Sequence, residues 1–216
     1  MYIVEFYETE DGDSQIWDFL EDLRLKAAVS KDARIQHKQA SLYIELLKQN
    51  GTRLNENITK HIEDGIWELR PGNNRVFYFF FRDNIYVLLH QFRKKSQKTP
   101  KQKNEKAKRE RDDYILKGER KMKTWDDYKN HVLDVDPEIA KEIKETEEIA
   151  AIVSAMIEKR KALGLTQRDL AAMCKIPQSS VARIESCKTT PNLGTLLNIL
   201  YQLGLTLTVA QREQIP

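Results

Sequence analysis

Two short helical patterns joined by a four-residue connector place the strongest constraint on how this chain folds. Small or apolar residues stand where two such helices must cross: Leu170, Ala171, Val181 and Ile184. The connector, residues 174–177, ends in Pro177, which can lead a helix without breaking it. The pattern therefore predicts helices over residues 167–174 and 178–185 that pack across each other.

The residues around these two helices complete a longer pattern. Glu185 precedes the turn 186–188, and Pro191 follows it. Over about residues 150–208 the sequence resembles the Xre/phage-repressor helix-turn-helix family, and this implies an all-α, DNA-binding domain. The usual glycine of the turn after the second helix is Cys187 here. We expect this cysteine to strain the turn and to leave the helices intact.

The resemblance also implies which residues contact DNA. Residues 178–185 would be the recognition helix in the major groove, and Gln167 would hold a phosphate at the N-terminus of the preceding helix. Gln and Arg form bidentate pairs with adenine and guanine, and Ser serves several bases. The residues on these positions are Gln167, Gln178, Ser179, Ser180 and Arg183. The helix is only modestly charged, so we expect a homodimer on a palindromic operator. The alternative is a helical bundle whose polar surface contacts nothing.

The first 120 residues predict a small α+β unit, two helices packed on an antiparallel sheet. Serines or an aspartate that can cap helices precede both helical patterns, and turn-forming residues separate the apolar runs. The expected elements are a strand at 2–7, helices at 14–28 and 30–51, strands at 66–70, 75–82 and 85–92, and a helix at 101–116.

A tight turn at residues 71–74 places Arg70 and Arg75 opposite each other. Like charges in such a pair destabilise a bare sheet, so we expect an anion, such as a phosphate between two guanidinium groups, to offset them. The next strand ends at residues 90–95 with a histidine, an aromatic ring and three cations. Cations, a group that titrates near neutrality and a ring for stacking are the parts of an RNA-cleaving site.

Three stretches, residues 69–70, 75–78 and 90–100 with its HxFxKKxxxTP pattern, resemble the RelE/HigB toxin superfamily, especially its phage-derived branch. The resemblance covers about residues 1–116 and implies an endoribonuclease that cleaves messenger RNA on the ribosome. The RNA's own 2′-hydroxyl would attack the adjacent phosphate, so the protein must move protons and balance charge. The residues that match the family's site are Arg70, Arg75, His90, Lys94 and Lys95.

Each of these assignments has an alternative. Arg75 matches the arginine that stabilises the phosphate, and Arg70 either assists it as its neighbour or pairs with Glu68 or another carboxylate. His90 is either an acid–base group or a hydrogen-bonded residue at a strand end. The two lysines either act in catalysis or only hold the RNA backbone. Phe92 is a weak candidate for stacking on a base.

The composition changes at Met122. Residues 93–111 carry ten basic and two acidic residues, and residues 122–150 carry four basic and nine acidic residues. We expect three parts: a toxin-like domain at 1–121, an acidic toxin-contacting segment at 122–150, and the DNA-binding domain at 151–216. The acidic segment would face the basic one, with apolar anchors at Trp125, Tyr128, Val132, Leu133 and Ile139. The alternative is an ordinary solvated acidic helix.

A toxin-like part followed by a repressor-like part is similar to the HigB–HigA order of toxin–antitoxin operons. The resemblance implies that the second part neutralises the first and represses their shared promoter. The partners would be ribosome-bound mRNA and operator DNA, and the fusion at Met122 would be natural or engineered. The alternatives are a non-enzymatic transcriptional regulator whose N-terminal domain binds a ligand or partner, and a catalytically inactive toxin fold.

Composition excludes several other classes of protein. The chain has no apolar run of the length that a membrane helix needs, and its N-terminus lacks a secretory signal pattern. Cys174 and Cys187 suit neither a disulfide framework nor a metal site. We therefore expect a cytoplasmic protein with no metal, no cofactor and no membrane partner.

Overall fold

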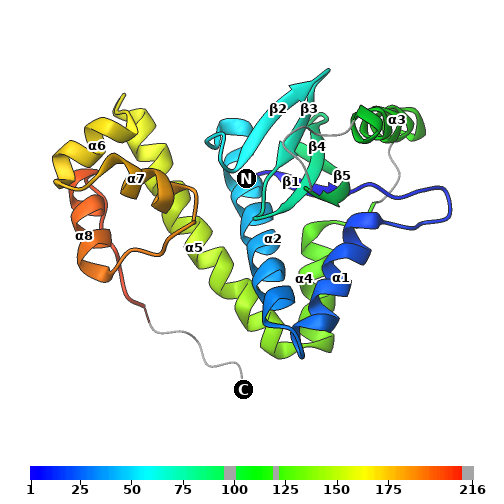
Figure 1. Ribbon diagram of the computed structural model, residues 1–216, viewed down its shortest axis with the longest axis horizontal. Helices are drawn as coiled ribbons and strands as arrows, with labels where there is room; N and C mark the ends of the chain where they lie inside the picture. Colours follow the sequence, from blue (N-terminus) through cyan, green and yellow to red (C-terminus); the bar gives the residue numbers. More distant parts are fainter. Residues whose placement is uncertain (95–100, 119–121, 211–216) are drawn as a thin grey trace. The chain divides into compact units, whose positions relative to one another are not determined.

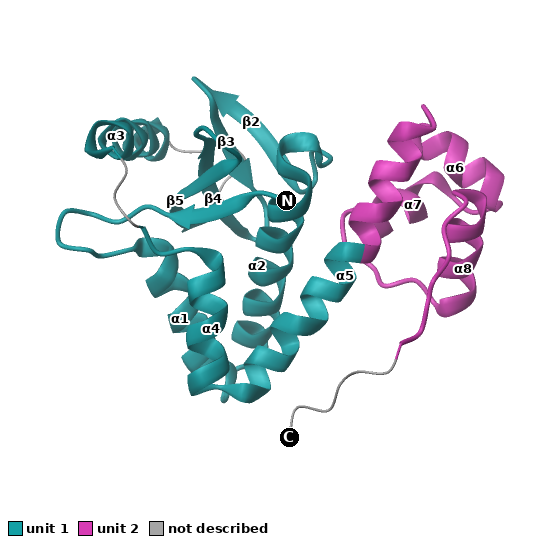
Figure 2. Cartoon of the chain, turned by 180° about the vertical axis from the view of Figure 1, so that it is seen from behind, with its two compact units in different colours: residues 1–151 teal, residues 152–216 magenta. Residues whose placement is uncertain are grey.

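The computed structural model describes residues 1–94, 101–118 and 122–210. The chain forms two compact units, residues 1–151 and residues 152–216 (Figure 2). The division therefore falls close to the expected start of the DNA-binding domain. Residues 122–150 lie in the same unit as the residues that precede them.

The first unit is built on a five-stranded sheet (Figure 1). The strand order is β1-β5-β4-β3-β2, with β1 parallel to β5 and every other pair antiparallel. The strands are β1 (Ile3–Phe6), β2 (Thr59–Glu63), β3 (Ile66–Leu69), β4 (Asn74–Phe80) and β5 (Ile85–Arg93). The α+β fold class is confirmed, and β1 makes the sheet mixed.

The edge strand β2 was not expected from the sequence, although a turn signal precedes β3. Asp64 and Gly65 both have positive φ, 49° and 76°. A two-residue turn with this geometry joins the strands of a hairpin. Only Thr59 of β2 is buried, so the apolar alternation that reveals a strand is missing there.

Helices cover both faces of the sheet (Figure 1). On one face lie α1 (Gln15–Ala27) and α2 (Lys31–Asn50), which the side chains of Ser14 and Ser30 cap as expected. A short 3-10 helix, η1 (Gly51–Arg53), follows α2. On the other face lies α3 (Lys101–Lys117), which buries Ala107 and Tyr114 among apolar residues of the sheet such as Phe77, Phe79 and Phe92.

The helix α4 (Trp125–Val135) packs against α1 and α2. The backbone N–H of Phe6 donates to the carbonyl of Lys123 at 2.8 Å, and the ring of Tyr128 meets that of Trp17 edge-on at 5.2 Å. The buried residues of α4 are Trp125, Tyr128 and Val132. Of the other two expected anchors, Ile139 is buried and Leu133 is exposed, so the expectation for Leu133 is wrong.

The acidic residues that follow residue 121 pair with bases of α1 and α2. The pairs are Arg24–Asp136 at 3.1 Å, Arg34–Glu142 at 2.5 Å, Lys38–Glu145 at 3.0 Å and Lys48–Asp126 at 2.5 Å. The expectation that this segment faces the basic residues 93–111 is therefore wrong. The apolar face of α4 packs on α1 and α2, which brings the neighbouring carboxylates to these helices, whereas α3 covers the other face of the sheet (Figure 1).

The sequence of residues 136–163 predicts two helices, one that runs through Glu148 and a second from Ile149 to Leu163, but the helix α5 (Pro137–Ala162) is continuous. No glycine or proline interrupts it there, and Asp136 accepts a hydrogen bond from the backbone of Ile139 at its start. The second unit contains the end of α5 and three shorter helices, α6 (Gln167–Cys174), α7 (Gln178–Glu185) and α8 (Leu193–Gln202). Their shared core includes Met156, Leu170, Val181, Ile199 and Leu203.

The alternation of apolar and polar residues from Leu205 to Val209 predicts a strand, but no strand forms there. This segment follows α8 without regular structure, and its side chains after Leu205 are exposed. Within the described part of the second unit there is no other strand to accept its hydrogen bonds, and one strand alone is not stable. Among the described residues, no helix combines the length and the apolar character that a membrane span needs.

Candidate functional site

The arginine pair predicted from the sequence lies at the β3–β4 turn, where one buried carboxylate holds both side chains. Arg70 Nε donates to Glu68 Oε1 at 2.9 Å, and Arg75 Nε lies 3.3 Å from the same oxygen. The pairing of Leu69 with Val76 places the two arginines across the turn from each other. The anion expected between them is therefore Glu68, a residue of the chain itself.

Backbone carbonyls fix the two guanidinium groups further. Arg75 Nη1 donates to the carbonyls of Gly72 at 2.9 Å and Asn74 at 2.6 Å, and Arg70 Nη1 donates to the carbonyl of Glu56 at 3.0 Å. Burial lowers the pKa of the Arg75 guanidinium below its usual value, and the charge of Glu68 opposes this effect. These contacts orient both guanidinium groups in advance.

His90 lies deep inside the unit. Its ring is fully buried on β5, meets Phe77 edge-on at a centroid distance of 5.3 Å, and places Nδ1 2.6 Å from Glu110 Oε2 on α3. Its other nitrogen, Nε2, has no hydrogen-bond partner among the described residues. The structure thus supports the alternative of a hydrogen-bonded histidine, and a substrate could reach it only if α3 moved away.

The helix α3 closes the face of the sheet that carries His90 and Phe92. Lys108 forms ion pairs with Glu63 at 3.3 Å and Asp64 at 2.9 Å, next to the β2–β3 turn. Lys103 Nζ lies 5.9 Å from the ring centre of Phe92, so this ring is also covered. The sequence indicated a basic helix, but its position over the sheet depends on contacts between distant residues.

Of the two predicted lysines, Lys94 lies among the described residues. Lys94 follows β5, its side chain is exposed, and its backbone N–H donates to the carbonyl of Asn73 at 2.9 Å. The predicted site residue Lys95 lies outside the described residues. Arg70, Arg75 and Lys94 therefore surround one end of the β3–β4–β5 sheet, where a polyanion can meet several cations.

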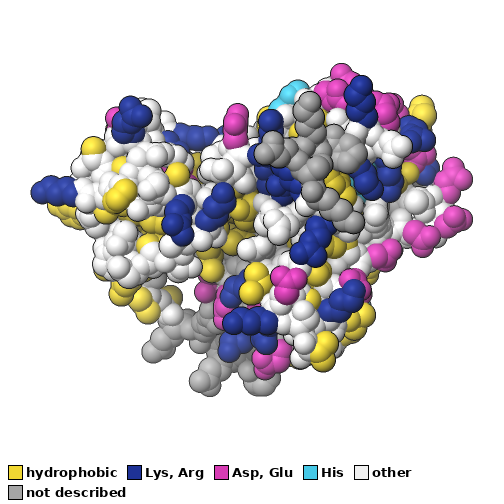
Figure 3. All heavy atoms as spheres, viewed as in Figure 1, with side chains coloured by type: hydrophobic (Ala, Val, Ile, Leu, Met, Phe, Trp, Pro, Cys, Tyr) yellow, Lys and Arg dark blue, Asp and Glu magenta, His cyan; other side chains and the backbone are white. Residues whose placement is uncertain are grey.

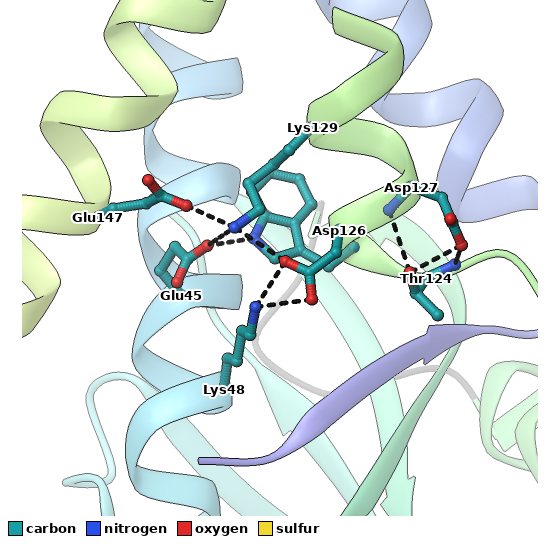
Figure 4. Close-up of polar contacts among 8 residues, drawn as sticks. Glu45, Lys48, Thr124, Asp126, Asp127, Lys129 and Glu147 are labelled. Carbon is teal, nitrogen blue, oxygen red and sulfur yellow. Dashed lines mark hydrogen bonds and ion pairs between the residues drawn. The ribbon is translucent and has the colours of Figure 1, made fainter. Parts of the chain in front are cut away.

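A polar network joins α4 to α2 (Figure 4). Trp125 Nε1 donates to Glu45 Oε1 at 2.5 Å, and Lys129 Nζ contacts Glu45, Asp126 and Glu147. Burial by itself would lower the pKa of Lys129, but these carboxylates raise it above its ordinary value. Because the buried polar groups of Trp125 and Lys129 have partners, these contacts fix the position of α4 against α2.

In the second unit, α6 and α7 form the expected helix-turn-helix arrangement. Gln178 and Ser179 lie exposed in the first turn of α7, Ser180 is half-buried, and Arg183 is exposed one turn later. The side chain of Arg183 donates to Thr189 Oγ1 at 2.9 Å. The first turn of the predicted recognition helix thus presents amide and hydroxyl groups to the solvent.

A buried ion pair that the helix-turn-helix pattern did not predict orients these residues. Arg160 donates through Nε and Nη2 to the two carboxylate oxygens of Glu185, at 2.6 and 2.8 Å. Gln167 Nε2 donates to Glu185 at 2.9 Å, and Gln178 Nε2 donates to Gln167 Oε1 at 3.2 Å. The chain of contacts runs from α5 to the first residue of α7. The sequence signal that could have revealed this ion pair is the charged residue Glu185 on the buried face of α7, because a buried carboxylate needs a partner.

Comparisons with known proteins agree with this division. Residues 29–112 match the family model described as "Phage derived protein Gp49-like (DUF891)", and residues 156–209 match the model described as "Helix-turn-helix". A Haemophilus influenzae protein named "Uncharacterized HTH-type transcriptional regulator" is 32% identical over 85 residues. This alignment covers 39% of the present chain and 82% of that protein.

Proposed function

The chain belongs to the helix-turn-helix transcriptional regulators, and from this premise we propose that it is a toxin–antitoxin regulator in one chain. In this proposal the first unit is a ribosome-dependent mRNA endoribonuclease of the HigB type, and the second unit is a HigA-type repressor of its own promoter. The observation that carries the proposal is the union, in one chain, of a Gp49-like unit and a helix-turn-helix unit.

For RNA cleavage we assign the phosphate to the arginine pair. Arg75 and Arg70 are oriented by Glu68 and balance the charge that develops on the scissile phosphate. Lys94 and Lys95 hold the RNA backbone. His90 anchors α3 through Glu110 and takes no direct part in proton transfer while α3 covers it.

For DNA binding we assign base contacts to Gln178, Ser179, Ser180 and Arg183, and a phosphate contact to Gln167. The buried pair Arg160–Glu185 supports this role, since it holds Gln167 and through it Gln178. Residues that are held in place before binding lose less conformational entropy on the DNA.

For neutralisation we assign the contact to α4 and the start of α5. These helices pair with Arg34 and Lys38 of α2, whereas the contacts of Arg70 and Arg75 are made by Glu68 and by the carbonyls of Glu56, Gly72 and Asn74. We therefore propose that residues 122–151 prevent docking on the ribosome and leave the arginine pair uncovered.

The nuclease proposal is tested with the chain divided at residue 121. Residues 1–121 should stop translation and cut ribosome-bound mRNA, and addition of residues 122–216 should restore translation. Arg75→Ala should lower the cleavage rate by about 100-fold, as for loss of one oxyanion-stabilising donor. Primer extension on translated mRNA measures the cleavage, and Lys60→Ala, which removes an exposed charge on β2, is the matched control.

Intact mRNA in the presence of folded residues 1–121 would reject the nuclease proposal. If circular dichroism shows that this piece does not fold alone, the full chain with a protease site between Gly118 and Met122 takes its place. After cutting, the two pieces contain every residue of the original chain.

The DNA proposal is tested by anisotropy with the chain's own promoter. Arg183→Ala should weaken specific binding by about 10- to 100-fold, since a bidentate base contact contributes about 1–3 kcal/mol. Lys159→Ala, an exposed charge on α5, should change binding only slightly. Equal losses for the two variants would contradict the assigned recognition helix.

A second candidate is a regulator without enzymatic activity, whose first unit only binds a partner or ligand. The observations in its favour are the buried ring of His90 and the carboxylate of Glu68 between the two arginines. If residues 1–121 bind ribosomes or mRNA without cleavage, this second candidate is preferred.

A further inference from the structure

A row of aromatic rings crosses the sheet of the first unit from one edge to the other. Each ring contacts the next, and the distances between ring centres are 5.0 Å for His61–Trp67, 6.4 Å for Trp67–Tyr78, 5.7 Å for Tyr78–Tyr86, 5.2 Å for Tyr86–Phe80 and 5.0 Å for Tyr86–Tyr2. These six residues are called the aromatic row below. The row begins on the edge strand β2 and ends at the residue before β1.

The register of the strands places these rings on one face of the sheet. Trp67 is opposite Tyr78 on the neighbouring strand, and Phe80 is opposite Tyr86. Consecutive residues of a strand point to opposite faces. Ile66, which precedes Trp67, packs in the core with residues of α3. The aromatic row therefore lies on the face that α1 and α2 cover in part.

Part of the row is open to solvent beyond the end of α2. The backbone N–H of Thr52, just after this helix, donates to the Tyr86 hydroxyl at 3.2 Å, and Tyr86 is buried. Farther along the row, Phe80 is 47% exposed, His61 is exposed and Trp67 is half-buried. Figure 3 shows a histidine side chain (cyan) at the surface over β2. The contacts within the row hold these rings in place and leave part of each accessible to a ligand.

Basic side chains stand beside the row. Burial raises the pKa of the Tyr86 hydroxyl, and the charge of Arg53 in η1 acts in the opposite direction, so this arginine lies close to the row. Arg82 is exposed in the turn after β4 and places its guanidinium 5.0 Å from the ring centre of Phe81. Single-stranded nucleic acids need both kinds of group, because their phosphates attract cations and their bases stack on aromatic rings.

Unpaired RNA fits the aromatic row for three reasons. Every base has a flat face, so a series of rings accepts successive bases of any sequence. RNA-recognition domains stack two or three bases on aromatic side chains of an open sheet face in this way. The carboxylates at the β2–β3 turn, Glu63 and Asp64, form ion pairs with Lys108, which offsets their repulsion of phosphates.

We propose that the aromatic row is a second RNA-binding site, on which bases of single-stranded RNA stack. The inference deepens the RNA-cleaving part of the proposed function and rests on it for its role: the arginine pair holds the phosphate that is cut, and the row holds unpaired bases at a separate surface. The ligand is an unpaired segment of the messenger RNA or of the ribosomal RNA. The residues assigned to phosphates, Arg70, Arg75 and Lys94, do not belong to the row.

Fluorescence anisotropy with the full chain and a labelled oligoadenylate of about ten nucleotides tests the proposal. Trp67→Ala and Phe80→Ala should each weaken binding by about 5- to 150-fold, the loss expected for one stacked base. Trp67→Phe and Phe80→Tyr keep a ring and should restore most of the affinity. Tyr201→Ala, which removes a 79% exposed ring of α8 in the second unit, is the matched control and should leave binding unchanged.

The salt dependence separates stacking from attraction to phosphates. Loss of a ring should lower the affinity by the same factor at each salt concentration, whereas Arg53→Ala should reduce the slope of log affinity against log salt concentration by about 0.7. Circular dichroism monitors the fold of each variant, and His61→Ala supplies a second test at an exposed ring with little packing to lose.

Three results would overturn the proposal. One is an unmodified chain that binds neither the oligoadenylate nor ribosomes. Another is binding that folded Trp67→Ala, Phe80→Ala and His61→Ala leave unchanged, or that Tyr201→Ala weakens as much. The third is ring variants that lose ribosomes while their affinity for oligoadenylate stays intact, since the row would then bind a ribosomal protein. Weaker binding of both oligoadenylate and mRNA-free ribosomes would identify ribosomal RNA as the source, and weaker binding of oligoadenylate alone would identify messenger RNA.

Cleavage assays separate this inference from the proposed function. If the ring variants lose RNA binding and residues 1–121 leave mRNA intact, the RNA site stands and the nuclease fails. If mRNA is cut and the ring variants bind and cut as the unmodified chain does, the nuclease stands and the RNA site fails. If both hold, Trp67→Ala should raise KM with little change in kcat, whereas Arg75→Ala should lower kcat.

Discussion

At the scale of single residues, four helix ends of the second unit close in the same way. One or two residues after each helix stands a residue with positive φ: Gly164, Lys175, Cys187 and Gly204, at 69°, 54°, 53° and 68°. In each case the next backbone N–H reaches back five residues to a carbonyl of the helix, as Lys188 does to Arg183 at 2.8 Å. Lys175 and Cys187 thus adopt a conformation that favours glycine.

Lys175→Gly should therefore stabilise the second unit. The side chain of Lys175 is exposed, so its loss removes little packing, and the backbone strain is relieved. We expect a gain of about 0.5–1 kcal/mol in the free energy of unfolding, measured in urea. Gly164→Ala, at the matching position after α5, should destabilise by a similar amount. A loss of stability in Lys175→Gly would show that this turn is not strained.

At the scale of elements, the contact between α2 and α4 contains a buried histidine. His37 is fully buried, and its Nε2 lies 3.1 Å from the hydroxyl of Tyr128. Burial lowers the pKa of His37 to about 4; the charge of Arg24 lowers it too, and those of Glu21 and Asp136 act in the opposite direction. His37 is therefore neutral in the folded protein at physiological pH.

This histidine should make the first unit less stable in mild acid. The unfolded chain binds a proton at His37 near pH 6.5, and the folded chain binds it only near pH 4. Between these values the unfolded state holds more protons, so stability falls as the pH falls. We expect a loss of about 2 kcal/mol between pH 7 and pH 5 from this group.

Urea unfolding at the two pH values measures the effect in the unmodified chain and in His37→Gln. The variant should lose about 2 kcal/mol less than the unmodified chain over this range. His61→Gln, which changes an exposed histidine on β2, should behave as the unmodified chain does. The same pH dependence in all three proteins would mean that His37 is not the group responsible.

At the scale of the whole molecule, the border in composition at Met122 does not coincide with a border in packing. The compact first unit extends to Ala151, and Met122, Trp125 and Tyr128 are buried in it. The residues that follow Met122 thus supply a helix, α4, to the unit that the residues before it build.

Two separate pieces, residues 1–121 and 122–216, should therefore assemble when they are mixed. The burial of α4 against α1 and α2, with the contacts of Glu45 and Lys48, supplies the free energy of association. Trp125→Ala should weaken the complex by about 30- to 100-fold, since a buried tryptophan is a typical hot spot. Leu133→Ala, an exposed residue of the same helix, is the control, and calorimetry measures both. Equal affinities for the two variants would contradict a specific role of α4.

Local signals predicted much of the fold and part of the candidate site. Serine caps predicted the starts of α1 and α2, and the turn at 71–74 predicted that Arg70 and Arg75 lie together. The strand β2 was missed because it lies at an edge with little apolar alternation. The sequence left undecided whether His90 is buried, because the helix that covers it, α3, begins eleven residues later in the chain.

The sequence by itself determined the class of each half, the positions of most helices and the helix-turn-helix pattern, because caps, turns and periodic apolar residues act over a few residues. Only the tertiary structure decided that Glu68 holds both arginines, that α3 covers His90 and that α4 joins α1 and α2. These outcomes depend on which surfaces bury the most apolar area with their polar groups satisfied, and that is a property of the folded chain as a whole.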